Sequence, residues 1–133
     1  MSDKRTITLT GRPPVRISDD NWPMLASASD KIFDGEYESQ ANRITKWFVG
    51  VRQHNDGRAI VYAIFSYSTN WRGERDASKK CGQMLDAGSS TDDIIRAIGE
   101  VCSEMGGWHD EYIDPWDRLK AECIADLPAV ELE

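Results

Sequence analysis

The fold is decided by residues 44–67, which read ITKWFVGVRQHNDGRAIVYAIFSY. The first part is rich in bulky and β-branched residues, three of which lie on one side of an extended chain: Trp47, Val49 and Val51. Asp56-Gly57 follows, and this dipeptide supplies the positive φ angles that tight hairpin turns require. Residues 59–67 are apolar on both faces of a second strand. A strand of that kind belongs inside a sheet with one face under helices, so the stretch predicts a central antiparallel hairpin.

The residues before this hairpin predict two short extended segments and a helix. Residues 6–10 read as a strand, and an extended segment resumes at Val15 and Ile17 after two prolines. Residues 18–21 offer helix-capping side chains, and apolar residues follow at helical spacing: Trp22, Leu25 and Ala26. A short helix is therefore expected there. Residues 36–40 are expected to add a strand beside the hairpin, and residues 79–85 fit either a short strand or an irregular segment.

The C-terminal end predicts two amphipathic helices. Ser90 can cap the first, with Asp93 three positions later in the manner of a capping box. Its apolar residues recur at helical spacing and end before two glycines: Ile94, Ile98, Val101, Cys102 and Met105. The second helix begins with Asp114 as the cap and Pro115 at the first helical position, and Pro128 stops it. Its inner stripe consists of Trp116, Leu119, Cys123 and Leu127.

Together these elements predict an α+β protein, in which an antiparallel sheet of three to five strands is covered by two or three helices, the last two at the C-terminal end. A chain of 133 residues with 40% hydrophobic and 29% charged residues is typical of a folded domain, so residues 1–133 are expected to form one domain. Neither a long apolar run nor a signal-peptide pattern occurs. The three cysteines are odd in number and indicate no disulfide framework, so a cytoplasmic location is expected.

Charge is divided unevenly along the chain. Residues 1–80 carry 13 Lys and Arg against 10 Asp and Glu, whereas residues 81–133 carry 3 against 13. The net charge of −7 is therefore the sum of +3 and −10. The acidic end can simply pack beside the mildly basic first part, or it can dock a basic partner. Because the whole chain is acidic, we expect no direct nucleic-acid binding, although residues 72–80 hold a small basic cluster with Trp71 beside it.

The sequence lacks the motifs that are typical of enzymes and of metal sites. No glycine-rich phosphate loop, dinucleotide fingerprint or paired Cys/His ligand spacing occurs, so no catalytic residue, cofactor or metal is assigned. Among the thiols, Cys81 is expected to be the most exposed, and Cys102 and Cys123 are expected to be buried. His54 reads as a solvated turn residue. An alternative is a small enzyme with a site made of His109, Asp110 and Tyr112.

The five tryptophans divide into two groups. Trp47 and Trp116 fall on predicted inner faces and are expected in the core, and Trp22 fits either the core or a cover for the sheet edge. Trp71 and Trp108 lie in predicted loops between charged residues. Exposed indoles of that kind bury a large area at little entropic cost, so both are candidate interface anchors.

Several short runs resemble a set of known proteins. The runs are LTGRPPVRI (residues 9–17), NWP (21–23), VRQH (51–54), DGR (56–58) and GER (73–75). They resemble uncharacterised small accessory proteins encoded on bacterial mobile genetic elements, and the resemblance covers about residues 7–100. It implies no activity and no site residues. It does favour a role in host interaction or in countering host defence.

The leading hypothesis is therefore a non-enzymatic interaction protein whose acidic C-terminal helical face docks a basic protein, such as a host defence or nucleic-acid-handling protein that it inhibits. The candidate partner-binding residues are Trp71, Asp92, Asp93, Glu100, Glu104, Trp108, Asp110 and Glu111. A self-associating domain without a charged partner is a further alternative, so a homo-oligomer is also considered.

Overall fold

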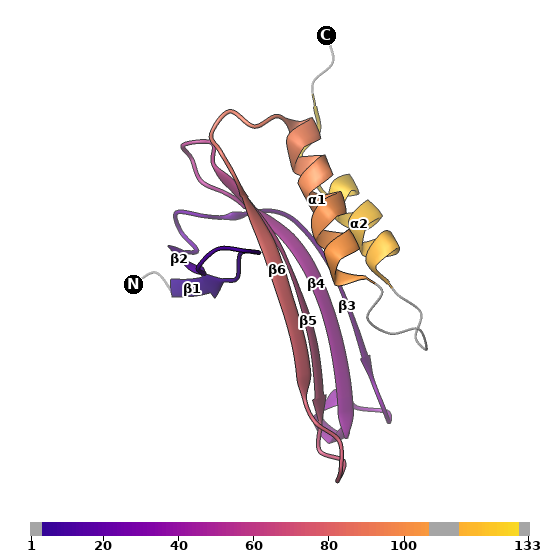
Figure 1. The fold of residues 1–133 in the computed structure, drawn as a ribbon. Coiled ribbons are helices and arrows are strands. Elements are labelled where there is room, and N and C mark those ends of the chain that lie inside the picture. Colours follow the sequence, from indigo (N-terminus) through magenta and orange to yellow (C-terminus); the bar gives the residue numbers. More distant parts are fainter. Residues whose placement is uncertain (1–3, 107–114, 131–133) are drawn as a thin grey trace.

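The computed structural model describes residues 4–106 and 115–130. The elements follow in the order β1 (Lys4–Ile7), β2 (Val15–Ser18), β3 (Met24–Phe33), the 3-10 helix η1 (Glu38–Gln40), β4 (Arg43–Gln53), β5 (Ala59–Thr69), β6 (Ala77–Leu85), α1 (Thr91–Met105) and α2 (Trp116–Ala125). β1 and β2 form a two-stranded sheet, and the other strands form a four-stranded sheet in the order β3-β4-β5-β6. This is the predicted α+β fold, with the two helices at the C-terminal end (Figure 1).

The β4–β5 hairpin lies at the centre of the sheet and confirms the expectation from residues 44–67. Pairing is antiparallel and uninterrupted from Arg43 opposite Thr69 to Gln53 opposite Ala59. Gly57 in the turn has a φ of 99°, which explains why glycine follows Asp56. β3 pairs with the outer side of β4 and β6 with the outer side of β5, so the hairpin is flanked on both sides.

The helix expected after residues 18–21 is wrong, because residues 24–33 form β3. Along β3 the buried positions alternate with more exposed ones: Ala26 and Ala28 lie in the core, whereas Ser27 and Ser29 do not. A period of two is produced by a strand and not by a helix. The spacing of apolar residues after residue 21 is compatible with a helix and with a strand. Pairing with β4 stabilises the strand.

Residues 36–40 do not form the expected strand either. They belong to the β3–β4 connection, which contains the 3-10 helix η1. Its Glu38 lies between two lysines of neighbouring strands, accepting a hydrogen bond from Lys31 and lying 3.8 Å from the Nζ of Lys46. Residues 79–85, for which the sequence allows a short strand or an irregular segment, lie within the strand β6.

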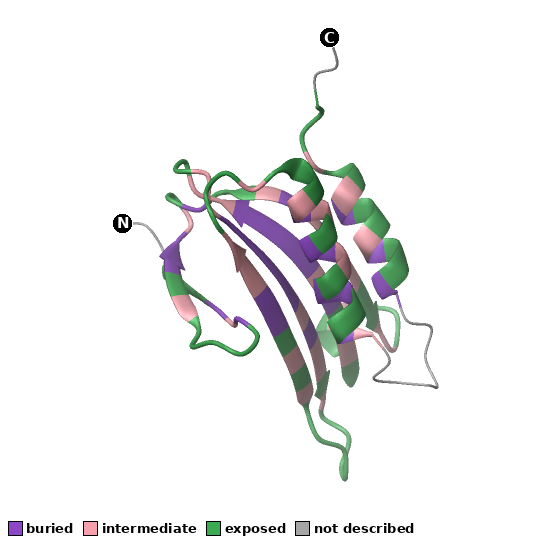
Figure 2. Ribbon diagram, turned by 45° about the horizontal axis from the view of Figure 1, so that its top comes forward, coloured by how far each residue is buried: buried purple, intermediate pink, exposed green. Residues whose placement is uncertain are grey.

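α1 and α2 cover one face of the four-stranded sheet (Figures 1 and 2), where they enclose the larger core. Ser90 caps α1 in the predicted capping box. Trp47 and Trp116 are buried, as expected for core tryptophans. The central core residues of this layer come from three strands and both α-helices: Val49, Val61, Cys81, Ile98, Val101, Leu119 and Cys123. Asp114, the expected cap of α2, lies outside the described residues.

The β1–β2 hairpin and the segment after it cover part of the opposite face. Ile7, Ile17 and Trp22 form a second core cluster there with Ile60 and Tyr62 of β5. Trp22 is therefore a core residue, with 7% of its surface exposed. Two separate cores, one on each face, explain why β5 is apolar on both sides.

The far ends of the strands run past the helices and carry the β3–β4 and β5–β6 connections (Figure 1). The two connections meet there, because the backbone amide of Asn70 donates to the carbonyl of Asn42 at 2.9 Å. Three exposed large apolar residues lie at this end: Ile32, Tyr37 and Trp71. Neither described helix is long and apolar enough to cross a membrane.

Candidate functional site

One edge of α1, beside β6, carries three carboxylates, which we call the α1 acidic edge: Asp93, Glu100 and Glu104. Their spacing of seven and four residues places them on one side of the helix, over roughly 16 Å. Gln83 Nε2 of β6 donates to Glu100 Oε2 at 2.8 Å, and Thr10 Oγ1 donates to Glu104 at 3.1 Å. The Ser90 amide donates to Asp93 Oδ2 at 2.9 Å. Each carboxylate is therefore held in one orientation.

The side-chain donors to Glu100 and Glu104 are neutral, although the ammonium of Lys79 also lies at this end of α1 and donates to the backbone carbonyl of Glu104 at 2.6 Å. Glu100 and Glu104 form no ion pair with another described residue, and Asp93 has only Arg96 at 3.5 Å. The hydrogen bonds from the backbone amide of Ser90 are the main cause of the lowered pKa of Asp93. α1 as a whole carries four acidic residues and one basic residue, whereas α2 carries two of each. Within the described helices the excess negative charge belongs to α1.

Acidic residues in the first part of the chain lie in a different environment. Asp19 pairs with Arg5 at 3.0 Å, Glu74 with Arg43 at 2.8 Å and Asp56 with Arg58 at 2.8 Å. Glu38 lies between Lys31 and Lys46. These ion pairs cancel much of the local charge, so the α1 acidic edge is the more concentrated source of negative field.

The structure separates the candidate partner-binding residues into groups. Asp92 is exposed at the start of α1, beside the α1 acidic edge. Trp71 follows β5 at the end of the sheet remote from the start of α1, and 49% of the residue's surface is exposed. Eleven residues of β5 separate the two ends, which is roughly 34 Å at about 3.4 Å per residue. Asp93, at the start of α1, lies near the end of the sheet remote from Trp71, whereas Glu104 lies beside Lys79, which pairs with Phe65 four residues before the end of β5. Trp71 is therefore far from the Asp93 end of the α1 acidic edge and nearer to its Glu104 end.

Several sequence candidates lie outside the described residues. They are Trp108, Asp110 and Glu111, together with the remaining members of the alternative enzyme site, His109 and Tyr112. Among the residues that the structure does describe, no group of three or more His, Cys, Asp or Glu side chains could hold a metal ion.

The expected exposure of Cys81 is wrong, because only 1% of its surface is exposed. β6 turns Cys81 towards α1, where its thiol lies 3.5 Å from the carbonyl oxygen of Val101. Burial raises the pKa of Cys81 to about 12, and it also raises the pKa of Cys102 to about 12 and of Cys123 to about 11. Thiols with such high pKa values are not thiolates near neutral pH, so none of the three is a good nucleophile.

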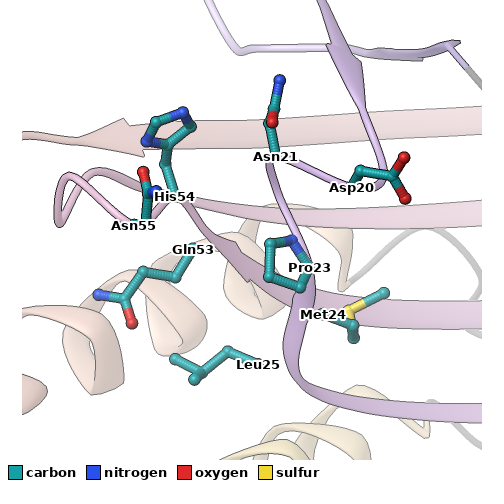
Figure 3. Close-up of a pocket in the computed structure, with 8 residues that line it drawn as sticks. All are labelled: Asp20, Asn21, Pro23, Met24, Leu25, Gln53, His54 and Asn55. Carbon is teal, nitrogen blue, oxygen red and sulfur yellow. The ribbon is translucent and has the colours of Figure 1, made fainter. Parts of the chain in front are cut away.

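A hollow of about 290 Å³, which the sequence did not indicate, opens at the end of the sheet away from Trp71 (Figure 3). Its walls come from the segment before β3, the start of β3, the end of β4 and the turn that follows it: Asp20, Asn21, Pro23, Met24, Leu25, Gln53, His54 and Asn55. His54 is not simply a solvated turn residue, since its ring lies 5.0 Å from that of Trp22. The lining residues are about thirty positions apart in the chain, and only the β3–β4 pairing brings them together.

Comparison with known proteins found no matching family model, no matching curated protein and no matching solved structure.

Proposed function

We propose that this protein is a non-enzymatic interaction protein that docks the α1 acidic edge onto a basic surface of another protein. The observation that carries the proposal is that the carboxylates of Glu100 and Glu104 are oriented by neutral donors, Gln83 and Thr10, and form no ion pair with a described residue. A set of pre-oriented, unpaired carboxylates loses little conformational entropy on binding. It also accelerates encounters with a cationic partner and selects against anionic ones.

The class of partner follows from the same charge and from the resemblance described above. A basic surface that normally meets nucleic acid would also fit a rigid row of carboxylates. We therefore propose that the partner is a host defence protein or a nucleic-acid-handling protein, and that docking inhibits it. Asp92 adds a further exposed carboxylate at the start of α1, although as the neighbour of Asp93 it does not lie on the same side of the helix.

The test is a charge reversal, Glu100→Lys with Glu104→Lys, in a protein immobilised as bait for a bacterial lysate. We expect a basic protein to be retained by the wild type at low salt, lost at high salt and not retained by the reversed variant. The captured protein is then purified, and its dissociation constant is measured directly. Two reversed contacts are expected to weaken binding by about tenfold or more.

The matched control is Glu36→Lys with Asp117→Lys. It changes the net charge by the same amount at two exposed positions away from the α1 acidic edge. This control is expected to bind as the wild type does. Equal loss in both variants would show that only net charge matters, and no difference between wild type and the Glu100/Glu104 variant would refute the proposal.

A further inference from the structure

The acidic side chains of the β5–β6 connection, residues 70–76, are hydrogen-bonded to other groups of the same protein. Glu74 accepts hydrogen bonds from Arg43, Tyr67 and Thr69, which lower its pKa to about 2. Asp76 accepts from the backbone amide of Thr69 at 2.9 Å. The two arginines of this connection, Arg72 and Arg75, are exposed and form no ion pair with a described residue. Glu74 is ion-paired with Arg43, so the two exposed arginines of the connection outnumber its one carboxylate that forms no ion pair with a described residue, Asp76.

Trp71 stands beside these arginines in a fixed position. The guanidinium of Arg43 lies 5.0 Å from the centroid of the indole ring. The backbone amide of Trp71 donates to Thr69 Oγ1 at 3.1 Å, and a hydrogen bond from its side chain contributes to the lowered pKa of Asp34. Half of the residue nevertheless remains exposed. A rigid, exposed tryptophan flanked by arginine has the composition of an interface anchor.

The hollow at the other end of the sheet has complementary properties. Pro23, Met24 and Leu25 give it an apolar wall, and Met24 is 39% exposed (Figure 3). Asp20, which is exposed and forms no ion pair with a described residue, stands on its rim. A cavity of about 150 Å³ holds benzene in a protein interior, so a hollow of about 290 Å³ can receive a two-ring indole.

We propose that the chain associates with itself head to tail, with Trp71 of one copy seated in the hollow of the next and Arg72 and Arg75 facing its Asp20. Trp71 and the hollow lie at opposite ends of β4, so a molecule cannot fill its own hollow. The contact joins two different surfaces, and such heterologous contacts extend into chains or close into rings. It leaves the α1 acidic edge out of the contact and is therefore independent of the function proposed above.

The test is sedimentation velocity of the purified full chain from roughly 1 μM to 1 mM. We expect the weight-average sedimentation coefficient of the wild type to rise with concentration. Trp71→Ala and Met24→Arg are each expected to weaken association by about thirtyfold or more, as loss of a central anchor does. Val130→Arg is the control, since it changes an exposed residue that does not line the hollow and should associate as the wild type does.

A mixture of the two defective variants provides the decisive measurement. Trp71→Ala retains the hollow and Met24→Arg retains the tryptophan, so an equimolar mixture should form a complex of two chains and no larger species. Circular dichroism verifies that both variants are folded. A wild type that stays monomeric over the whole range would overturn the proposal and leave the hollow to another ligand, and so would a mixture that does not form the two-chain complex.

Discussion

The guanidinium of Arg52 connects the two sheets and is 6% exposed. Its Nε donates to the hydroxyl of Tyr62 at 3.0 Å, and its Nη1 donates to the carbonyl of Trp22 at 2.9 Å and lies 3.4 Å from Asp19. Asp19 also pairs with Arg5 of β1. A buried charge is tolerated only when its donors are satisfied, so the position of the β1–β2 hairpin and the charge of Arg52 depend on each other.

Replacing Arg52 by alanine should therefore lower the free energy of unfolding by about 2–4 kcal/mol, because the buried hydroxyl of Tyr62 and carbonyl of Trp22 lose their donor. Arg58→Ala is the matched control. It removes an arginine that lies over the ring of the same tryptophan, but its side chain is 43% exposed, so a loss below about 1 kcal/mol is expected. Equilibrium urea denaturation measures both, and equal losses would contradict the assigned role of Arg52.

At the scale of elements, α1 and α2 could be predicted because each buries one face and exposes the other. The β4–β5 hairpin could be predicted because two runs of bulky and β-branched residues flank the Asp56-Gly57 turn. β3 could not, because Trp22, Leu25 and Ala26 fit a helical face, and only pairing with β4 excludes it. The alternation of Ala26 and Ala28 with serines was the signal available, but alanine and serine differ little in hydrophobicity.

Two glycines, one in β6 and one in α1, should respond to alanine in opposite directions. A Cβ at Gly82 would lie 2.5 Å from the carbonyl oxygen of Thr8, where residues 8–10 cover the edge of β6. Gly82→Ala should cost about 1–3 kcal/mol through overpacking. A Cβ at Gly99 would meet nothing closer than 3.8 Å, so Gly99→Ala should add about 0.5–1 kcal/mol through helix propensity. Thermal unfolding of both variants tests this, and a shift of the two in the same direction would contradict it.

At the scale of the whole molecule, the mildly basic first part of the chain and its acidic last part occupy different regions of the fold. The basic part forms most of the sheets, where several acidic residues are ion-paired, whereas Glu100 and Glu104 of α1 form no ion pair with a described residue. The sequence predicted that Asp93, Glu100 and Glu104 share a helix. It could not predict the neutral donors Gln83 and Thr10, nor the separation of Trp71 from the start of α1, because both depend on the tertiary pairing of distant segments.

Acid should destabilise the molecule from about pH 4.5 downward. The pKa values of Asp19, Asp34, Glu38, Asp56, Glu74 and Asp93 are all lowered by hydrogen bonds or ion pairs in the folded state. A carboxyl with a lowered pKa stabilises the fold above its unfolded pKa, and this contribution disappears as the pH falls through the folded value. For Glu74 that window extends from 4.5 to about 2. Glu74→Gln should therefore flatten the pH dependence of the unfolding midpoint in that range, and an unchanged slope would contradict the assignment.

The strand order β3-β4-β5-β6 has a consequence for how the chain folds during synthesis. Every pairing in the large sheet joins strands that are neighbours in the chain, so each one closes only a short loop. The sheet can therefore grow by one hairpin at a time as the polypeptide leaves the ribosome. The two cores can form only at different stages of synthesis. The core around β1 and β2 requires Ile60 and Tyr62 of β5, whereas the core on the opposite face of the sheet is not covered until α1 and α2 have been synthesised.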